Sequence, residues 1–193
     1  MKPLGMLGVC LGLASILAFG RAAIAADLEV GDEAPEFQGK TDEGKTWKSE
    51  DYVGKKIVVV YFYPADFTRG CTKQACGFRD DMAHLKEKGV EVVGVSGDSV
   101  KGHELFKKHH ELNFTLLADE DGSIAKKFGV PLAKGGTVTS PEIDGQTHEI
   151  IRGVTAQRQT FVIDKEGKIA LKNDKVDAAE DSKAILAAVE KLQ

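Results

Sequence analysis

Two cysteines lie five positions apart in the stretch "YPADFTRGCTKQACGFRD", at Cys71 and Cys76. The only other cysteine is Cys10, close to the N-terminus. The five-residue spacing differs from that of zinc-binding cysteines and from the two-residue gap of a thioredoxin-type redox pair. The pair is therefore expected to be two buried thiols, a structural disulfide or a couple that is oxidised and reduced in turn.

The chain around Cys71 indicates a strand followed by a helix. Residues 57–63 ("IVVVYFY") form a continuous β-branched and aromatic run, typical of a strand buried on both faces, and Pro64 ends it. Apolar residues then recur at helical spacing over residues 71–88, before Gly89. Cys71 is thus expected in the first helical turn, where unpaired backbone N–H groups and the helix dipole favour a thiolate over a thiol. The sequence predicts a nucleophilic, oxidisable cysteine.

Thr68 and Pro64, both of which precede Cys71 in the chain, fit this chemistry. Thr68 can place a hydroxyl beside the sulfur, and Pro64 can exclude water without adding a backbone donor. A permanent disulfide to Cys76 fits poorly, because five residues of ideal helix separate the Cα atoms by ~8–9 Å. A disulfide requires ~4.4–6.8 Å. A bond between the two sulfurs would need the first turn to unwind, which a transient disulfide can accommodate.

The rest of the chain alternates strands and helices. This order predicts one α/β domain of three layers with a mixed central sheet. The expected elements are an N-terminal hairpin turning at "DEGK", strands at 90–96 and 114–119, helices at 98–112 and 122–130, a hairpin over 158–173 and a helix at 178–192. Residues 131–157, rich in Gly, Thr and Pro, are expected to be irregular.

The N-terminus has the pattern of a secretory signal peptide. Lys2 is followed by uncharged residues 3–20, then by Arg21 and an A-x-A site at residues 23–25. Residues 1–25 are expected to be removed, which leaves the single domain at 26–193 in the periplasm or outside the cell. An uncleaved membrane anchor is the alternative, although the apolar run is short of the ~20 residues that span a bilayer. Without that segment, no stable membrane association is expected.

The charge of the chain bears on its partners. The net charge is −4 at pH 7, so there is no electrostatic basis for nucleic-acid binding. An exported protein also meets an oxidising environment, in which a disulfide can persist.

The motif "PADFTRGC" resembles the active-site pattern of peroxiredoxins: Pro, three residues, Thr, two residues, Cys. The continuation "CTKQACGFRD" is similar to the peroxiredoxin Q subfamily, also called the bacterioferritin comigratory protein group, within the AhpC/TSA-like proteins. The similarity runs from "VGDEAPEF" to "TFVIDKEGKI". It implies a thioredoxin-like three-layer sandwich and a thiol peroxidase that uses no bound cofactor and no metal.

The resemblance also assigns residues. It implies that Cys71 is the peroxidatic cysteine, Cys76 the resolving cysteine, Thr68 the hydroxyl that bonds thiolate and peroxide, and Pro64 the shielding proline. Arg158, in the pattern "R-x-T-F", matches the arginine that approaches the cysteine from a distant strand. A guanidinium suits that role because it is always charged and can orient a peroxide oxygen.

By composition alone Arg152 would serve as well as Arg158, and only the "R-x-T-F" match distinguishes them. The implied cycle reduces hydrogen peroxide or organic hydroperoxides through a Cys71 sulfenic acid and a Cys71–Cys76 disulfide. A thioredoxin-like protein then reduces the disulfide. Because both cysteines belong to one chain, a monomer is expected.

Three other functions remain open. They are an exported thioredoxin-like copper-binding chaperone, a protein disulfide oxidoreductase and a non-enzymatic domain with a structural disulfide. The copper site would require a distant histidine ligand. His103 and His110 share one helix face, but a solvated face is expected there, as are surface positions for Arg69 and Arg79 and partial burial for Trp47. The segment 131–157 is longer and more polar than the resemblance implies, so its role is left open.

Overall fold

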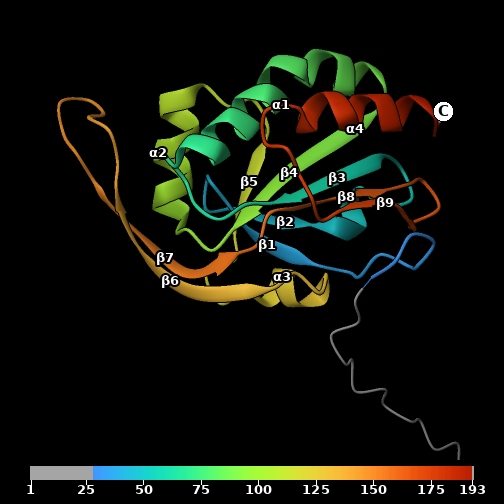
Figure 1. Ribbon diagram of the computed structural model, residues 1–193, viewed down its shortest axis with the longest axis horizontal. Coiled ribbons are helices and arrows are strands. Elements are labelled where there is room, and N and C mark those ends of the chain that lie inside the picture. The colour runs from blue at the N-terminus through green and yellow to red at the C-terminus, as the bar shows by residue number, and fades with distance from the viewer. Residues whose placement is uncertain (1–27, 193) are drawn as a thin grey trace, which may run out of the picture.

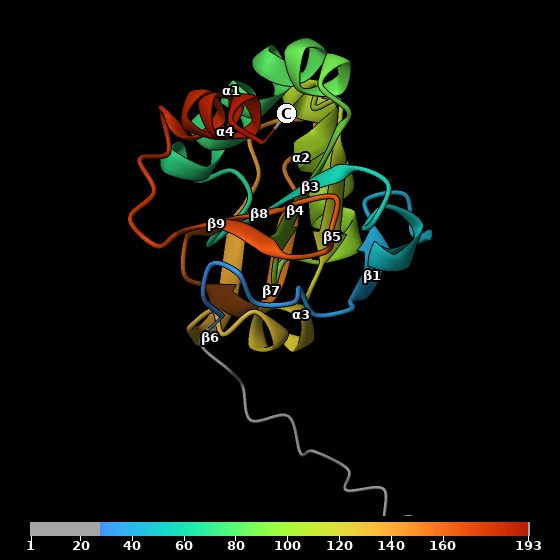
Figure 2. The same ribbon diagram turned by 90° about the vertical axis from the view of Figure 1, so that its right-hand side faces the viewer.

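The structure is organised around a seven-stranded sheet with helices on both faces (Figure 1). The computed structural model describes residues 28–192, so the predicted signal peptide at 1–25 lies outside the described residues. Three helices cover one face and one lies on the other in both views (Figures 1 and 2): α1 (Arg69–Glu87), α2 (Val100–His110) and α4 (Asp181–Glu190), opposite α3 (Ser123–Lys127). The predicted three-layer α/β arrangement is confirmed.

The sheet is mixed, as predicted. Its strand order is β2 (Thr46–Lys48), β1 (Gln38–Thr41), β5 (Thr115–Ala118), β4 (Val90–Ser96), β3 (Ile57–Phe62), β8 (Gln159–Ile163) and β9 (Ile169–Asn173). Strands β3, β4 and β5 are parallel, whereas β8 runs antiparallel to β3. The hairpins β1–β2 and β8–β9 confirm the two hairpins expected from the sequence.

Strand β3 is buried along its whole length, and its alternate side chains enter two different cores. Tyr61 packs with Cys71 under α1, whereas Val60 packs in the opposite core with Trp47. Trp47 is 5% exposed and stacks on Tyr52 with ring centroids 5.0 Å apart. The predicted packing role of Trp47 is confirmed, but its burial is more complete than expected, and the sheet separates it from Cys71.

The segment expected to be irregular contains two strands, which corrects that prediction. Strands β6 (Leu132–Thr139) and β7 (Glu149–Ala156) pair into an antiparallel ribbon that extends beyond α2 (Figure 1). We call residues 132–156 the β6–β7 arm. Every residue of β6 is exposed or half-buried. The sequence therefore lacks the alternation of apolar and polar residues by which a strand is predicted.

The base of the arm packs backbone against backbone on the turn after β4. Gly153 N donates to Gly97 O at 2.9 Å, and Ser99 N donates to Ile151 O at 3.1 Å. A Cβ atom on Gly97 would lie 2.1 Å from the Val154 carbonyl oxygen. Glycine at this position therefore permits the close approach.

None of the helices within residues 28–192 is long and apolar enough to cross a membrane.

Candidate active site

The loop after β3 delivers Cys71 to the first turn of α1, as predicted. Thr68 is the N-cap residue, and its carbonyl oxygen accepts a hydrogen bond from Thr72 N at 2.9 Å. Cys71 is 1% exposed, Cys76 is half-buried, and both are free thiols in the helix. Because both cysteines lie in a regular helix, a bond between their sulfurs requires the first turn to open.

Arg158, directly before β8, reaches across to this turn. Its Nη2 donates to Cys71 Sγ at 3.2 Å. Gly70 leaves the space for this approach, since a Cβ atom there would lie 3.2 Å from the same Nη2. A guanidinium in contact with the sulfur stabilises negative charge on it, in addition to the N-terminus of α1.

A relay of side chains fixes the orientation of the Arg158 guanidinium. Its Nη1 donates to Gln74 Oε1, and Gln74 Nε2 donates to Asp181 Oδ2 at 2.7 Å. Thr160 Oγ1 donates to the same carboxylate oxygen at 2.8 Å. Burial raises the pKa of Asp181, although the bonds from Gln74 and Thr160 oppose this.

The sequence interpretation missed two members of this relay. Gln74 could have been found, because it stands three positions after Cys71 and so shares its helix face. Asp181 carried no local signal, because 107 positions separate it from Gln74.

Thr68 and Pro64 lie in the loop that leads into α1, where both are half-buried. The Thr68 hydroxyl donates to the Ala65 carbonyl oxygen at 3.0 Å. Its oxygen keeps the capacity to accept a hydrogen bond. The structure thus places Thr68 at the start of the turn that carries Cys71, and it shows the Thr68 donor engaged with the loop.

Cys76 lies on the outer part of α1 beside Arg79. Burial raises the pKa of the Cys76 thiol, Arg79 opposes the rise and Asp80 adds to it. Arg79 is less solvated than the sequence suggested, because it donates to His110 O at 2.7 Å and pairs with Asp80 at 2.8 Å. Arg69 is exposed, as expected.

Arg152, the other candidate arginine, serves a different site. Its Nη1 lies 3.8 Å from Asp98 Oδ1, and its Nε donates to Thr155 Oγ1 at 2.9 Å. The arginine that contacts Cys71 is therefore Arg158.

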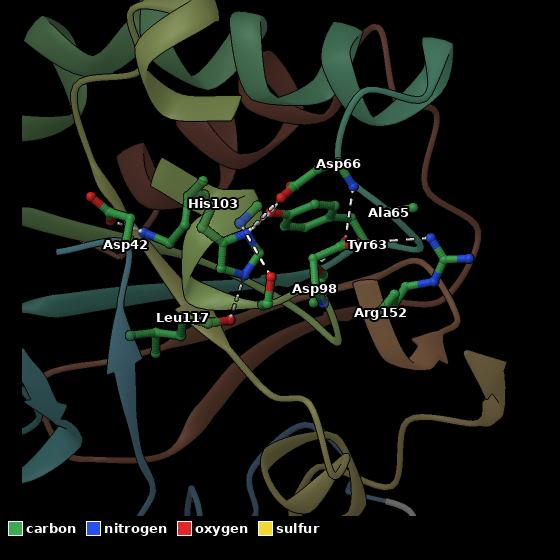
Figure 3. Close-up of polar contacts among 12 residues, drawn as sticks. Asp42, Tyr63, Ala65, Asp66, Asp98, His103, Leu117 and Arg152 are labelled. Atoms are coloured by element: carbon green, nitrogen blue, oxygen red, sulfur yellow. Dashed lines mark hydrogen bonds and ion pairs between the residues drawn. The ribbon is translucent and has the colours of Figure 1, made fainter. Parts of the chain in front are cut away.

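The prediction of a solvated position for His103 is wrong. It was expected on a solvated helix face, but its side chain is fully buried and contacts Asp66 at 2.8 Å (Figure 3). Its helix face is packed against the sheet, since Nε2 is 3.2 Å from the β5 carbonyl oxygen of Leu117. Within residues 28–192, no group of three or more His, Cys, Asp and Glu side chains is arranged to hold a metal ion.

Comparison with known proteins identifies the family of this chain. The AhpC/TSA family model matches residues 30–172. The chain belongs to the AhpC/TSA family. It is 44% identical over 143 residues to the putative peroxiredoxin bcp of Coxiella burnetii (strain RSA 493 / Nine Mile phase I), which covers 74% of this chain and 86% of the relative.

Two further relatives refine the placement. The chloroplastic peroxiredoxin Q of Populus jackii is 44% identical over 148 residues, covering 77% of this chain and 61% of that protein, so this chain spans about three fifths of its length. Among solved structures, the bacterioferritin comigratory protein of Xanthomonas campestris, studied for its alkyl peroxide reduction activity, has a TM-score of 0.66 at 27% identity. That match covers 85% of this chain and 96% of the other. The thioredoxin-like fold expected from the sequence is confirmed.

The family match contains Cys71, Cys76 and Arg158 but ends before α4. Asp181, which anchors the relay to Arg158, therefore lies outside the part of the chain that the family model describes.

Proposed function

We propose that this chain is a thiol peroxidase in which Cys71 reduces hydrogen peroxide and organic hydroperoxides. The main observation that supports this proposal is the 3.2 Å contact between Arg158 Nη2 and Cys71 Sγ in the first turn of α1. Membership of a family of peroxiredoxins supports the peroxidase activity, and the alkyl peroxide reduction studied in the Xanthomonas campestris neighbour supports the substrate class.

In the first step the Cys71 thiolate attacks the terminal oxygen of the hydroperoxide. The O–O bond breaks, Cys71 becomes a sulfenic acid, and the leaving alkoxide or hydroxide takes up a proton as alcohol or water. Arg158 and the free N–H groups of the helix terminus stabilise the charge that moves from sulfur to the leaving oxygen. Thr68, at the N-cap of α1, orients the peroxide, and Pro64 excludes water.

In the second step the first turn of α1 opens and the Cys76 thiol attacks the sulfenic sulfur. A Cys71–Cys76 disulfide forms and one water molecule leaves. A thioredoxin-like dithiol protein then reduces this disulfide and is itself oxidised. No bound cofactor enters the cycle, and resolution within one chain supports a monomeric enzyme.

We also propose that the protein works outside the cytoplasm, after removal of residues 1–25. The acidic net charge of −4 argues against a nucleic-acid partner.

The test follows the two cysteines directly by quenched-flow mass spectrometry of the mature protein, because Trp47 lies across the sheet from Cys71 and is a poor reporter. Wild type, Cys71→Ser and Cys76→Ser are each mixed with hydrogen peroxide and with cumene hydroperoxide. Wild type should form an intramolecular disulfide, Cys76→Ser should stop at a sulfenic acid, and Cys71→Ser should not react. Survival of wild-type thiols in excess peroxide for minutes would refute the proposal.

A further inference from the structure

A second polar network lies beneath the loop that joins β3 to α1, and the proposed reaction does not use it. Asp66, Asp98 and His103 each have 0% exposure, and they meet from three different elements (Figure 3). Burying ionisable groups is costly unless they are paired and hydrogen-bonded. Asp66 stands between Pro64 and Thr68, so the network holds the active-site loop itself.

The Asp66 carboxylate is held at both oxygens. Oδ1 accepts from the Tyr63 hydroxyl at 2.8 Å, and Oδ2 lies 2.8 Å from His103 Nδ1. His103 Nε2 lies 3.2 Å from the Leu117 carbonyl oxygen. A carbonyl oxygen only accepts, so His103 Nε2 carries a proton and donates to Leu117 O. Burial lowers the pKa of His103, but the adjacent Asp66, together with Asp98 and the Leu117 carbonyl, raises it by more, which favours a second proton on Nδ1 and a charge-assisted bond to Asp66.

The backbone of Asp66 is fixed as well. Its N–H donates to Asp98 Oδ2 at 2.9 Å, and the same oxygen accepts from Ser96 Oγ at 2.8 Å. The other oxygen of Asp98 faces Arg152 of the β6–β7 arm. Side chain and backbone of one loop residue are thus tied to α2, to the end of β4 and, through Asp98, to the base of the arm.

The next residue shows why the loop needs this hold. Phe67 has a φ of 57°, in the left-handed region that is unfavourable for a bulky side chain. Its ring packs on Phe106 of α2 at 5.1 Å. A strained backbone persists only when its surroundings fix it, so release of Asp66 would let the loop relax and the first turn of α1 open.

We propose that His103 is a positioning residue that holds the active-site loop in its peroxide-reactive form and so sets the balance between the two chemical steps. The inference rests on the proposed function. Reaction with peroxide needs Cys71 in the folded first turn beside Arg158, whereas disulfide formation needs that turn unwound. A contact that stabilises the folded turn therefore accelerates the first step and slows the second.

Two isosteric variants separate this role from general stability. In His103→Asn the amide nitrogen can occupy the place of Nδ1 and keep the bond to Asp66. In His103→Gln it can reach the place of Nε2, which keeps the bond to Leu117 O and abandons Asp66. Each variant removes the imidazolium charge and leaves one buried acceptor without its donor, so the two form a matched pair.

Both steps are measured for each variant with hydrogen peroxide. Oxidation of Cys71 is followed by sulfenic acid trapping in the Cys76→Ser background, and disulfide formation by rapid acid quench and mass spectrometry with Cys76 present. Losing a charge-assisted hydrogen bond should slow oxidation about tenfold and speed disulfide formation about tenfold in His103→Gln. Both rates of His103→Asn should stay within about threefold of wild type.

Opposite changes in the two rates, confined to His103→Gln, support the inference, because simple loss of stability would not produce them. Changes in the same direction, or equal behaviour of both variants, overturn it. If the histidine variants do not fold, Tyr63→Phe removes one donor to Asp66 and should shift both rates in the same opposed directions, by less, and unchanged rates would overturn the inference. A wild type that forms no disulfide overturns the proposed function instead, and this inference falls with it.

Discussion

Replacing Arg158 with methionine should slow the reaction of Cys71 with peroxide by about ten- to a hundredfold. Methionine keeps an unbranched chain of similar length and removes the guanidinium. The variant therefore tests the charge at the sulfur with little change in packing. Arg158→Lys should retain part of the rate, because an ammonium supplies the charge but not the planar fork that contacts both Gln74 and Cys71.

The magnitude follows from the geometry. Arg158 Nη2 lies 3.2 Å from Cys71 Sγ, and unit charges at that separation attract by about 5 kcal/mol at an effective dielectric constant of about 20. Arg158 is only half-buried, so solvent screens part of this attraction and about 1.5–3 kcal/mol remains, as for a hydrogen bond to a charged group. Since about 1.4 kcal/mol corresponds to tenfold in rate, the loss is about ten- to a hundredfold.

The assay is the second-order rate constant for sulfenic acid formation, measured in the Cys76→Ser background by quenched flow and mass spectrometry. Arg69→Met is the matched control, because it removes an exposed arginine from the first turn of the same helix. A rate for Arg158→Met within threefold of the parent protein would refute the reasoning. An equal loss in Arg69→Met would show that the effect is not local to the sulfur.

Two further predictions concern the space around Arg158 and the buried network. Gly70→Ala places a Cβ atom 3.2 Å from Arg158 Nη2 and should displace the guanidinium, so sulfenic acid formation should slow severalfold while the melting temperature stays near that of wild type. An unchanged rate would mean that the guanidinium can shift without cost. Burial raises the pKa of Asp98 from 3.8 to about 6, so the folded protein retains a proton that the unfolded chain has released. The free energy of unfolding should therefore fall by about 2 kcal/mol between about pH 4 and pH 6. Urea titrations across this range should show a shallower fall in Asp98→Asn, and an identical slope in both proteins would contradict the assignment.

The elements around Cys71 could be predicted because local patterns determine them. The apolar run of β3 and the helical spacing of α1 are visible within a few residues, and they place the cysteine in the first helical turn. The strands of the β6–β7 arm escaped prediction for the opposite reason. Their stability comes from pairing with each other and from the backbone contact at Gly97, and neither leaves an apolar period in the sequence.

The site itself was predictable only in part. The resemblance selected Arg158 over Arg152, and the contact with Cys71 agrees with that choice. His103 was misjudged because a histidine among lysines reads as solvated, whereas its partner Asp66 is 37 positions away and becomes its neighbour only when α2 packs on the sheet. Asp181 was missed because nothing near it in the chain relates it to a cysteine turn.

The dependence of Arg158 on Asp181 also has a consequence for how the protein is made. Asp181 lies 107 positions after Gln74, in α4, the last helix of the described residues to be synthesised. Until that helix docks, Cys71 and Arg158 can already meet, but the carboxylate that orients the guanidinium through Gln74 is missing. The contacts that orient Arg158 beside Cys71 are therefore completed late in synthesis, and a nascent chain in which α4 has not yet docked carries a less reactive cysteine than the folded domain.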